Sequence, residues 1–260
     1  MSKEHVDYLK KIKREKILIT ITQILIITVI LMIWEVAANK GWINTFISSS
    51  PSSILKMIIK LYKEGSLFHH IFTTFYEVII SFVLGTSLGI VIATILWRYN
   101  FLFKVLDPYL TILNSMPKVS LGPIIIIIAG AGSKSIILMA LLISVIITII
   151  DMHEAFIETD QNKIRLLQSF NASKKQIFFK LILPSNVGSL INTFKVNIGL
   201  VFIGVIMGEF LVSKAGVGYL IMYGSQVFNL NLVMTGIIIL AIMASLMYYV
   251  IVLIEKIFIK

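Results

Sequence analysis

Charged residues inside the long apolar stretches of this chain are the first candidates for chemistry: Glu77, Lys118, Lys195 and Glu209. An ionisable side chain is costly in hydrocarbon, so it pairs, reaches the lipid headgroups or lines a water-filled path. Glu77 and Lys195 lie where they can extend toward water, and we expect structural roles for them. For Lys118 and Glu209, a structural role and a place along a polar path are both open.

The residue types exclude most other chemistry. There is no Cys, which excludes thiolate zinc sites, disulfides and Cys nucleophiles. The His residues show no metal-ligand spacing, and no Ser/His/Asp arrangement or chain of buried acids is evident. The segment 130–135 resembles a phosphate-binding loop, but Ser133 separates Gly132 from Lys134. We therefore predict no catalytic residue, no metal site and no cofactor bound by this chain.

The composition is that of a membrane protein. Hydrophobic residues make up 58% of the 260 residues and charged residues only 14%, against about 45–50% and 25% in soluble domains. This excludes a soluble enzyme, a disordered chain and a nucleic-acid-binding domain. Apolar blocks suited to spans of roughly 20 residues lie at 17–38, 71–97, 103–130, 135–150, 188–212 and 232–255. The expected fold is all-α and polytopic, with about six transmembrane helices.

The charge distribution predicts the orientation. Lys and Arg are concentrated in residues 1–16 and in the polar segment 151–187, and positive charge marks the cytoplasmic side. We therefore place both termini and segment 151–187 in the cytoplasm, with residues 1–16 as a cytoplasmic segment and 17–260 as one membrane domain. The first apolar block has no small-residue cleavage site, so it is expected to be a retained span.

Two spans carry small residues at helical spacing, namely Ser81, Gly85 and Gly89 in one and Gly204 and Gly208 in the other. Such stripes let another helix backbone approach closely, and we predict helix packing there. Between the first two spans, Ser50 and Pro51 are typical of an N-cap and a first helical residue. The helix that follows has one apolar face and one Lys-rich face, and is expected to lie at the membrane interface.

Segment 151–187 predicts a helix–turn–helix. Asp160 can cap a helix over 161–170, and Asn171 stands where a helix end favours a left-handed residue. Ser173 and Gln176 form a capping box for a second helix, which Pro184 ends or kinks. Apolar residues near the turn either dock on a partner protein or pack back on the membrane domain. They are Leu166, Leu167, Phe170 and Ala172.

The same segment resembles the EAA loop of ABC importer permeases. The family pattern is EAA, three residues, Gly, nine residues and Ile-x-Leu-Pro. This chain keeps the spacing with Arg165-Leu166-Leu167, then Asn171, then Leu181-Ile182-Leu183-Pro184. Arg165 stands in place of the family Glu and Asn171 in place of the Gly, and Asn also tolerates the left-handed conformation.

Further motifs resemble permeases of the nitrate, sulfonate and taurine type over roughly residues 45–255. The matching segments are Ser48-Ser49-Ser50-Pro51-Ser52, Leu106-Asp107-Pro108, Met116-Pro117, Leu121-Gly122-Pro123, Gly130-Ala131-Gly132-Ser133-Lys134, Ile203 to Glu209 and Gly216 to Ile221. No single motif is decisive, but their order and spacing together are specific.

The resemblance implies a permease subunit in the cytoplasmic membrane of a bacterium. It implies two ATP-binding cassette ATPase subunits, a second permease subunit as in a homodimer, and an extracytoplasmic solute-binding protein. ATP and Mg would be used by the partner ATPase. The contact with the ATPase would be made by the loop residues Arg165, Leu166, Leu167, Ser169, Phe170, Asn171, Ala172, Ser173 and Lys174.

The expected function is ATP-driven import of a small solute by alternating access, with a nitrate-, sulfonate- or taurine-like anion favoured. Some relatives carry thiamine precursors or riboflavin, so that cargo is a second possibility. An ion-coupled secondary transporter is a third, although neither inverted repeats nor paired intramembrane charges are evident. A non-transporting scaffold or a membrane enzyme is the remaining class.

Overall fold

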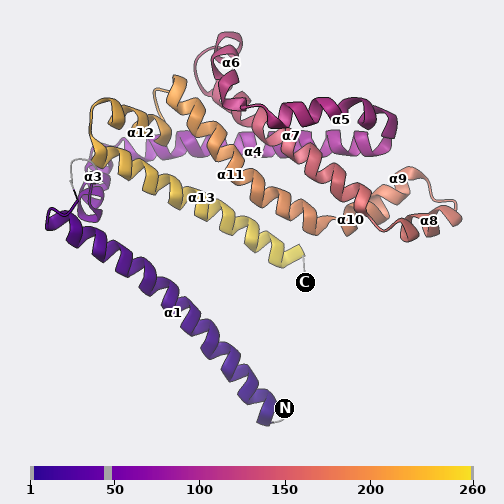
Figure 1. Cartoon of the computed structure of the whole chain (residues 1–260), viewed down its shortest axis with the longest axis horizontal. Helices are drawn as coiled ribbons and strands as arrows, with labels where there is room; N and C mark the ends of the chain where they lie inside the picture. Colours follow the sequence, from indigo (N-terminus) through magenta and orange to yellow (C-terminus); the bar gives the residue numbers. More distant parts are fainter. Residues whose placement is uncertain (1–2, 44–48, 259–260) are drawn as a thin grey trace.

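The computed structural model describes residues 3–43 and 49–258, and the regular elements within these ranges are helices (Figure 1). Ser48 of the serine-rich motif lies outside the described residues. Within the described residues, five helices are long and apolar enough to cross a membrane. They are α1 (Lys3–Asn39), α4 (Leu67–Arg98), α7 (Ser133–Glu158), α11 (Val187–Val212) and α13 (Leu230–Phe258).

The apolar block at 103–130 differs from the single span that was predicted. It contains α5 (Asn100–Ser115), the short 3₁₀ helix η1 (Lys118–Leu121) and α6 (Gly122–Ala129), with a bend of 90° between its two arms. Met116 is extended, with ψ 142°, because the ring of Pro117 disfavours a helical residue before it. The two arms make a sixth span only if they cross the membrane together.

Other helix ends also differ from the predicted boundaries. Helix α7 continues from the predicted block 135–150 to Glu158, so the first residues of the predicted loop 151–187 belong to it. Helix α1 begins at Lys3 and includes most of the polar segment 1–16. Apolar content marks the part of a helix that meets lipid, whereas the helix itself continues into water.

Helices α4 and α11 both pack on α7, which lies between them. The small residues lie at these contacts. A Cβ atom on Gly204 would lie 2.5 Å from the Cα of Ala140, and one on Gly208 would lie 3.0 Å from the Cα of Ile136. Gly85 and Gly89 of α4 face Ser144 and Thr148 of α7 in the same way, and Ser81 is fully buried.

Two groups of shorter helices lie at the two ends of this bundle (Figure 1). One end carries α3 (Pro51–Lys63) and α12 (Val217–Gln226). The other carries α8 (Gln161–Ser169), α9 (Lys174–Ile177), the π-helical turn Phe178–Ile182 and α10 (Leu183–Ser185). The start of α1 and the end of α13 both lie toward this α8–α9 end.

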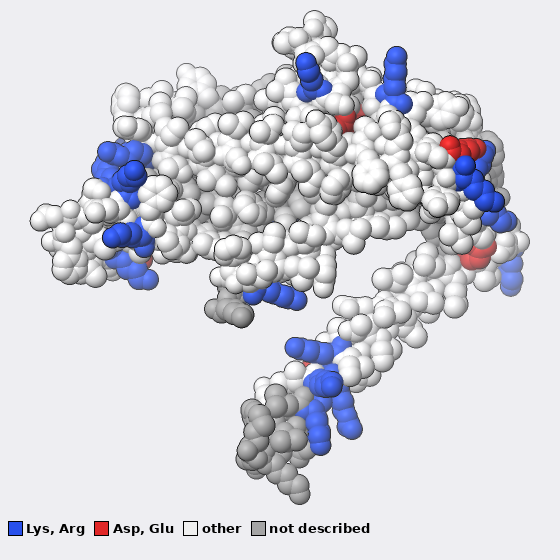
Figure 2. Space-filling model, turned by 180° about the vertical axis from the view of Figure 1, so that it is seen from behind, with Lys and Arg blue, Asp and Glu red and all other residues white. Residues whose placement is uncertain are grey.

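The surface charge follows the same division. On the face drawn in Figure 2, Lys and Arg gather at the α8–α9 end, at the opposite end and along the first part of α1. The long body between the two ends shows few charged side chains. A body of this kind is suited to a bilayer, with its charged ends in the headgroups and water.

Candidate functional site

The first helix of the α8–α9 segment has the predicted caps. Asp160 accepts a hydrogen bond from the backbone N–H of Asn162 at 2.9 Å. Asn171 adopts the left-handed conformation, with φ 54°. Its N–H donates to the carbonyl of Gln168 at 2.9 Å, and the next N–H, of Ala172, donates to the carbonyl of Leu167 at 3.0 Å. These two bonds make a Schellman motif, which satisfies the last carbonyls of α8.

The second helix begins at the predicted capping box. Ser173 Oγ accepts from the N–H of Gln176 at 3.3 Å, and Gln176 Oε1 accepts from the N–H of Ser173 at 2.8 Å. The chain then passes through the π-helical turn and Pro184 and changes direction at Asn186. The amide of Asn186 donates to Thr159 Oγ1 at 2.7 Å, which fastens the end of the segment to the end of α7.

The apolar side chains near the turn divide into two groups. Phe170 and Leu166 are 74% and 57% exposed. Leu167 and Ala172, in contrast, pack with Ile164 on a buried cluster that includes Phe156, Ile177 and Phe178. Leu167 and Ala172 therefore pack back on the membrane domain. Phe170 and Leu166 face outward, and their docking on a partner protein stays a prediction.

The polar residues of the turn lie around the two exposed apolar groups. Arg165, Ser169, Ser173 and Lys174 are exposed. The hydroxyl of Ser169 donates to the carbonyl of Leu166 at 2.7 Å, within α8 itself. The segment thus presents Phe170 and Leu166 on a basic surface, at one end of the bundle (Figure 2).

The turn depends on the backbone conformation of Asn171, which gives a first prediction. Asn171→Val should destabilise the segment by about 1–2 kcal/mol, because a β-branched residue is strained at positive φ. Asn171→Gly should be neutral or slightly stabilising. Hydrogen exchange of the amides in α8 and α9 measures the effect. Equal protection in the valine and glycine variants would contradict this account of the turn.

Lys195 forms an ion pair that the sequence did not indicate. Its Nζ lies 2.7 Å from Glu255 Oε2, and the side chains are only 20% and 33% exposed. The pair joins α11 to α13. Lys195 was expected to extend alone toward the surface. It instead pairs with Glu255, which is distant in the sequence.

The pair gives a second prediction. Lys195→Met and Glu255→Gln should each lower the thermal stability, because each leaves a half-buried charge without its partner. The double variant should lose less than the sum of the two, with a coupling of roughly 1 kcal/mol. Thermal unfolding of the four proteins in detergent gives the coupling directly. Strict additivity would show that the two charges do not interact.

Glu209 belongs to α11, and its carboxylate lies against the N-terminus of α12, with only 1% of the residue exposed. Its Oε1 accepts from Thr74 Oγ1 at 2.6 Å and its Oε2 from the N–H of Gly218 at 2.5 Å. A carboxylate at a helix N-terminus binds free N–H groups and faces the positive end of the helix dipole. A Cβ on Gly216 or Gly218 would collide with this carboxylate, so the glycines make room for it. Its place along a solute path stays a prediction.

Glu77 lies beside Glu209, and its side chain is fully buried. Neither of its carboxyl oxygens has a hydrogen-bond partner among the residues that the structure describes. The Glu77 carboxylate was expected to reach headgroup water, but within this single chain it is buried instead.

Lys118, the other candidate for the path, lies at the 90° bend. Its Nζ donates to the carbonyl of Asn114 at 2.9 Å, near the end of α5. A cation at this place faces the negative end of the helix dipole. Lys118 and Glu209 thus lie on separate elements. Lys118 has a partner one helical turn away, whereas the partners of Glu209 lie on α4 and at the start of α12.

Two polar residues that the sequence analysis did not single out are buried between helices. Asn197 of α11 donates to Thr148 Oγ1 at 2.6 Å and to Thr86 Oγ1 at 3.3 Å, so one amide joins α11, α7 and α4. His70 accepts at Nδ1 from the N–H of Gly216 at 3.1 Å. For Asn197, the sequence signal was an Asn inside an apolar block. For His70, the sequence held no such signal, because its hydrogen bond depends on tertiary contact.

Comparison with known proteins agrees with these features. Residues 85–260 match the family described as binding-protein-dependent transport system inner membrane component. SsuC of Bacillus subtilis, named for aliphatic sulfonate transport, is 27% identical over 86% of this chain and 81% of that protein. The taurine transport system permease protein TauC of Escherichia coli is 20% identical over 85% and 82%.

The fold is also found among solved structures. An inward-facing structure of the MetNI methionine ABC transporter contains a chain that aligns with a TM-score of 0.68. The alignment covers 76% of this chain and 98% of that one, at 17% identity. The all-helical membrane fold is therefore confirmed, and with it the assignment to transport rather than catalysis. The chain belongs to the family of binding-protein-dependent inner membrane components, as the permease subunit of an ABC importer.

Proposed function

We propose that this chain forms the path of an ATP-driven importer for a small oxyanion, with a sulfonate such as taurine as the favoured cargo. Family membership implies an ATPase and a solute-binding protein as partners. The α8–α9 end would be cytoplasmic and receive the ATPase, which alone would use ATP and Mg. The α3–α12 end would be outside and receive the binding protein, and a second copy of this chain would complete the path.

The observation that carries this proposal is the exposed apolar pair on the α8–α9 segment. Phe170 and Leu166 lie on a segment that is capped at both helix starts and fastened to α7 through Asn186. A motion imposed on such a segment would be passed to the spans as a rigid-body movement, and not lost in a flexible loop. The surrounding lysines would orient a partner by charge.

The favoured cargo is taken from the relatives. Those that match along most of the chain include proteins named for sulfonate and for taurine transport. The expected cycle is population shift between inward- and outward-facing states, driven by nucleotide binding in the partner.

The test is reconstitution in liposomes of the permease with its cognate ATPase and binding protein. Taurine, methanesulfonate, nitrate and a neutral pyrimidine are first tested for binding to the binding protein, and the ligand that binds is then used for uptake. Uptake should require ATP on the side of the membrane where the ATPase is bound. It should survive collapse of ion gradients. Uptake that persists without ATP but fails without an ion gradient would overturn the proposal.

A further inference from the structure

A cavity of about 480 Å³ lies at the α3–α12 end, within a single chain. Helices α3, α4, α12 and α13 and the adjoining loops supply its walls. We call it the α3–α12 cavity. Its polar lining residues include Lys60, Glu64, Ser66, His70, Tyr219 and Tyr223. A volume of this size accommodates a small solute together with some water.

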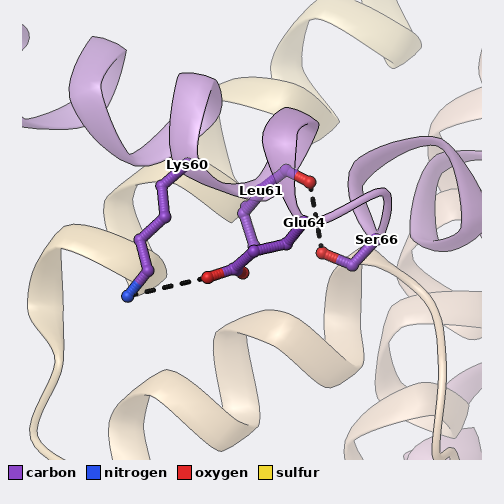
Figure 3. A network of polar contacts seen from close by, with 4 residues as sticks. All are labelled: Lys60, Leu61, Glu64 and Ser66. Carbon is purple, nitrogen blue, oxygen red and sulfur yellow. Dashed lines mark hydrogen bonds and ion pairs between the residues drawn. The ribbon is translucent and has the colours of Figure 1, made fainter.

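The rim of the cavity is electrically balanced. Lys60 Nζ lies 3.9 Å from Glu64 Oε1, one turn along α3, and both side chains extend to the same side of the helix (Figure 3). The hydroxyl of Ser66 donates to the carbonyl of Leu61 at 3.3 Å, which occupies its proton (Figure 3). Lys60 and Glu64 together add no net charge to this wall, and the hydroxyl proton of Ser66 is already used.

The opposite wall is a stack of three aromatic rings. Tyr219 lies between His70 and Tyr223, with both ring-centroid distances at 5.9 Å and both interplanar angles at 20°. His70 is 9% exposed. The stack holds its members in fixed orientations, so their polar atoms are positioned before a solute arrives.

The hydrogen bond from Gly216 determines what His70 offers to the cavity. Nδ1 accepts the backbone N–H, so it carries a lone pair, and the proton of the neutral ring is on Nε2. Nε2 has no hydrogen-bond acceptor among the described residues, and His70 lines the cavity. His70 presents an N–H donor.

The remaining free groups on this wall are donors too. The phenols of Tyr219 and Tyr223 have no hydrogen-bond partner among the residues that the structure describes, and each can donate one proton. Asn229 also lines the cavity, and its Oδ1 accepts from the N–H of Leu232 at 3.3 Å. That bond leaves the two N–H groups of the Asn229 amide free. This wall of the cavity therefore carries several hydrogen-bond donors that have no acceptor among the described residues.

We propose that the α3–α12 cavity binds the oxyanion group of the imported solute, with His70 and Tyr223 as specificity-determining donors. Several O–H and N–H groups that line one cavity match a sulfonate, nitrate or carboxylate, which has only acceptors to offer. The inference rests on the proposed import of an oxyanion and adds a binding site on the permease itself. Because the cavity lies at the α3–α12 end, a solute released by the binding protein at that end would reach it early on the path.

The test uses the permease–ATPase complex in lipid nanodiscs, without the binding protein. Saturation-transfer NMR compares methanesulfonate with dimethyl sulfone, in which a methyl group replaces one charged oxygen. Methanesulfonate should give a signal at least fivefold larger than the sulfone. His70→Phe should lower it at least fivefold. The neighbouring His69 is exposed, and His69→Phe is the matched control, with a signal within twofold of the unchanged protein.

Tyr223→Phe provides a second variant, because it removes only one hydroxyl from an exposed residue and leaves the ring in the stack. It should lower the methanesulfonate signal two- to threefold. Equal signals for the two probes, or no loss in both His70→Phe and Tyr223→Phe, would overturn the inference. ATP-dependent uptake by the reconstituted complex is measured separately. Uptake with an empty cavity rejects the site alone, whereas absent uptake rejects the proposed function.

Discussion

Gly204→Ala should strongly reduce the amount of folded permease, although it adds a single methyl group. The new Cβ would lie 2.5 Å from the Cα of Ala140 and 2.9 Å from its Cβ, so α11 and α7 would have to separate. The obstacle is largely backbone, and no side-chain rotation can relieve it. Overpacking of this kind costs about 1–3 kcal/mol and sometimes more. Thermal unfolding and the monodisperse fraction in detergent measure the loss.

The same helix provides the control. A Cβ on Gly199 would meet nothing within 4 Å, so Gly199→Ala should be neutral or stabilise by up to about 1 kcal/mol through helix propensity. The contrast between two Gly→Ala changes on α11 isolates the packing contribution from the propensity contribution. Similar unfolding temperatures for the two variants would mean that the contact between α11 and α7 is looser than described.

Phe170→Asp should abolish coupling while leaving the permease folded. The side chain is 74% exposed and makes no part of the buried cluster under α8. A carboxylate at the centre of a docked apolar contact would be desolvated without a partner, which costs several kcal/mol. We expect ATPase co-purification to fall at least tenfold and uptake with it, at an unchanged unfolding temperature.

Phe228→Asp is the matched control for this change. Phe228 is 73% exposed and lies between α12 and α13, at the opposite end of the bundle. This variant should keep ATPase binding within twofold. Leu167→Asp would be a poor substitute, because Leu167 packs on the buried cluster and its loss would unfold the segment. Normal uptake with Phe170→Asp would exclude the exposed pair as the docking surface.

The local features of the α8–α9 segment could be predicted from the sequence because each depends on neighbours in the chain. Asp160, Ser173 with Gln176 and Asn171 act on backbone groups within a few residues, so their types and spacing predict the caps. Ser50 and Pro51 likewise start α3, where Ser50 Oγ accepts from the N–H of Ser53 at 3.2 Å.

The features that were missed depend on residues far apart in sequence. Leu167 and Leu166 are adjacent, and only the position of Phe156 and Phe178 decides which of them is buried. Glu209 is stabilised by α12, whose position the sequence does not state. The 90° bend at Pro117 could not be predicted from the sequence either. Prolines do not always break a helix in this chain, since Pro108 lies inside α5 without ending it. A proline allows a sharp bend in the chain, and tertiary packing decides whether the bend forms.

The uninterrupted length of α7 has a mechanical consequence. From Ser133 to Glu158 the helix has 26 residues without a break, about 39 Å at 1.5 Å per residue. It begins at the 130–132 hairpin and ends beside α8. Because the helix is unbroken, a displacement of its last turn would move its first turn, at the hairpin, as part of the same rigid body. The return limb through Asn186 is kinked and would act as a joint. If the ATPase moves this segment, α7 would transmit the displacement and the kinked limb at Asn186 would accommodate it.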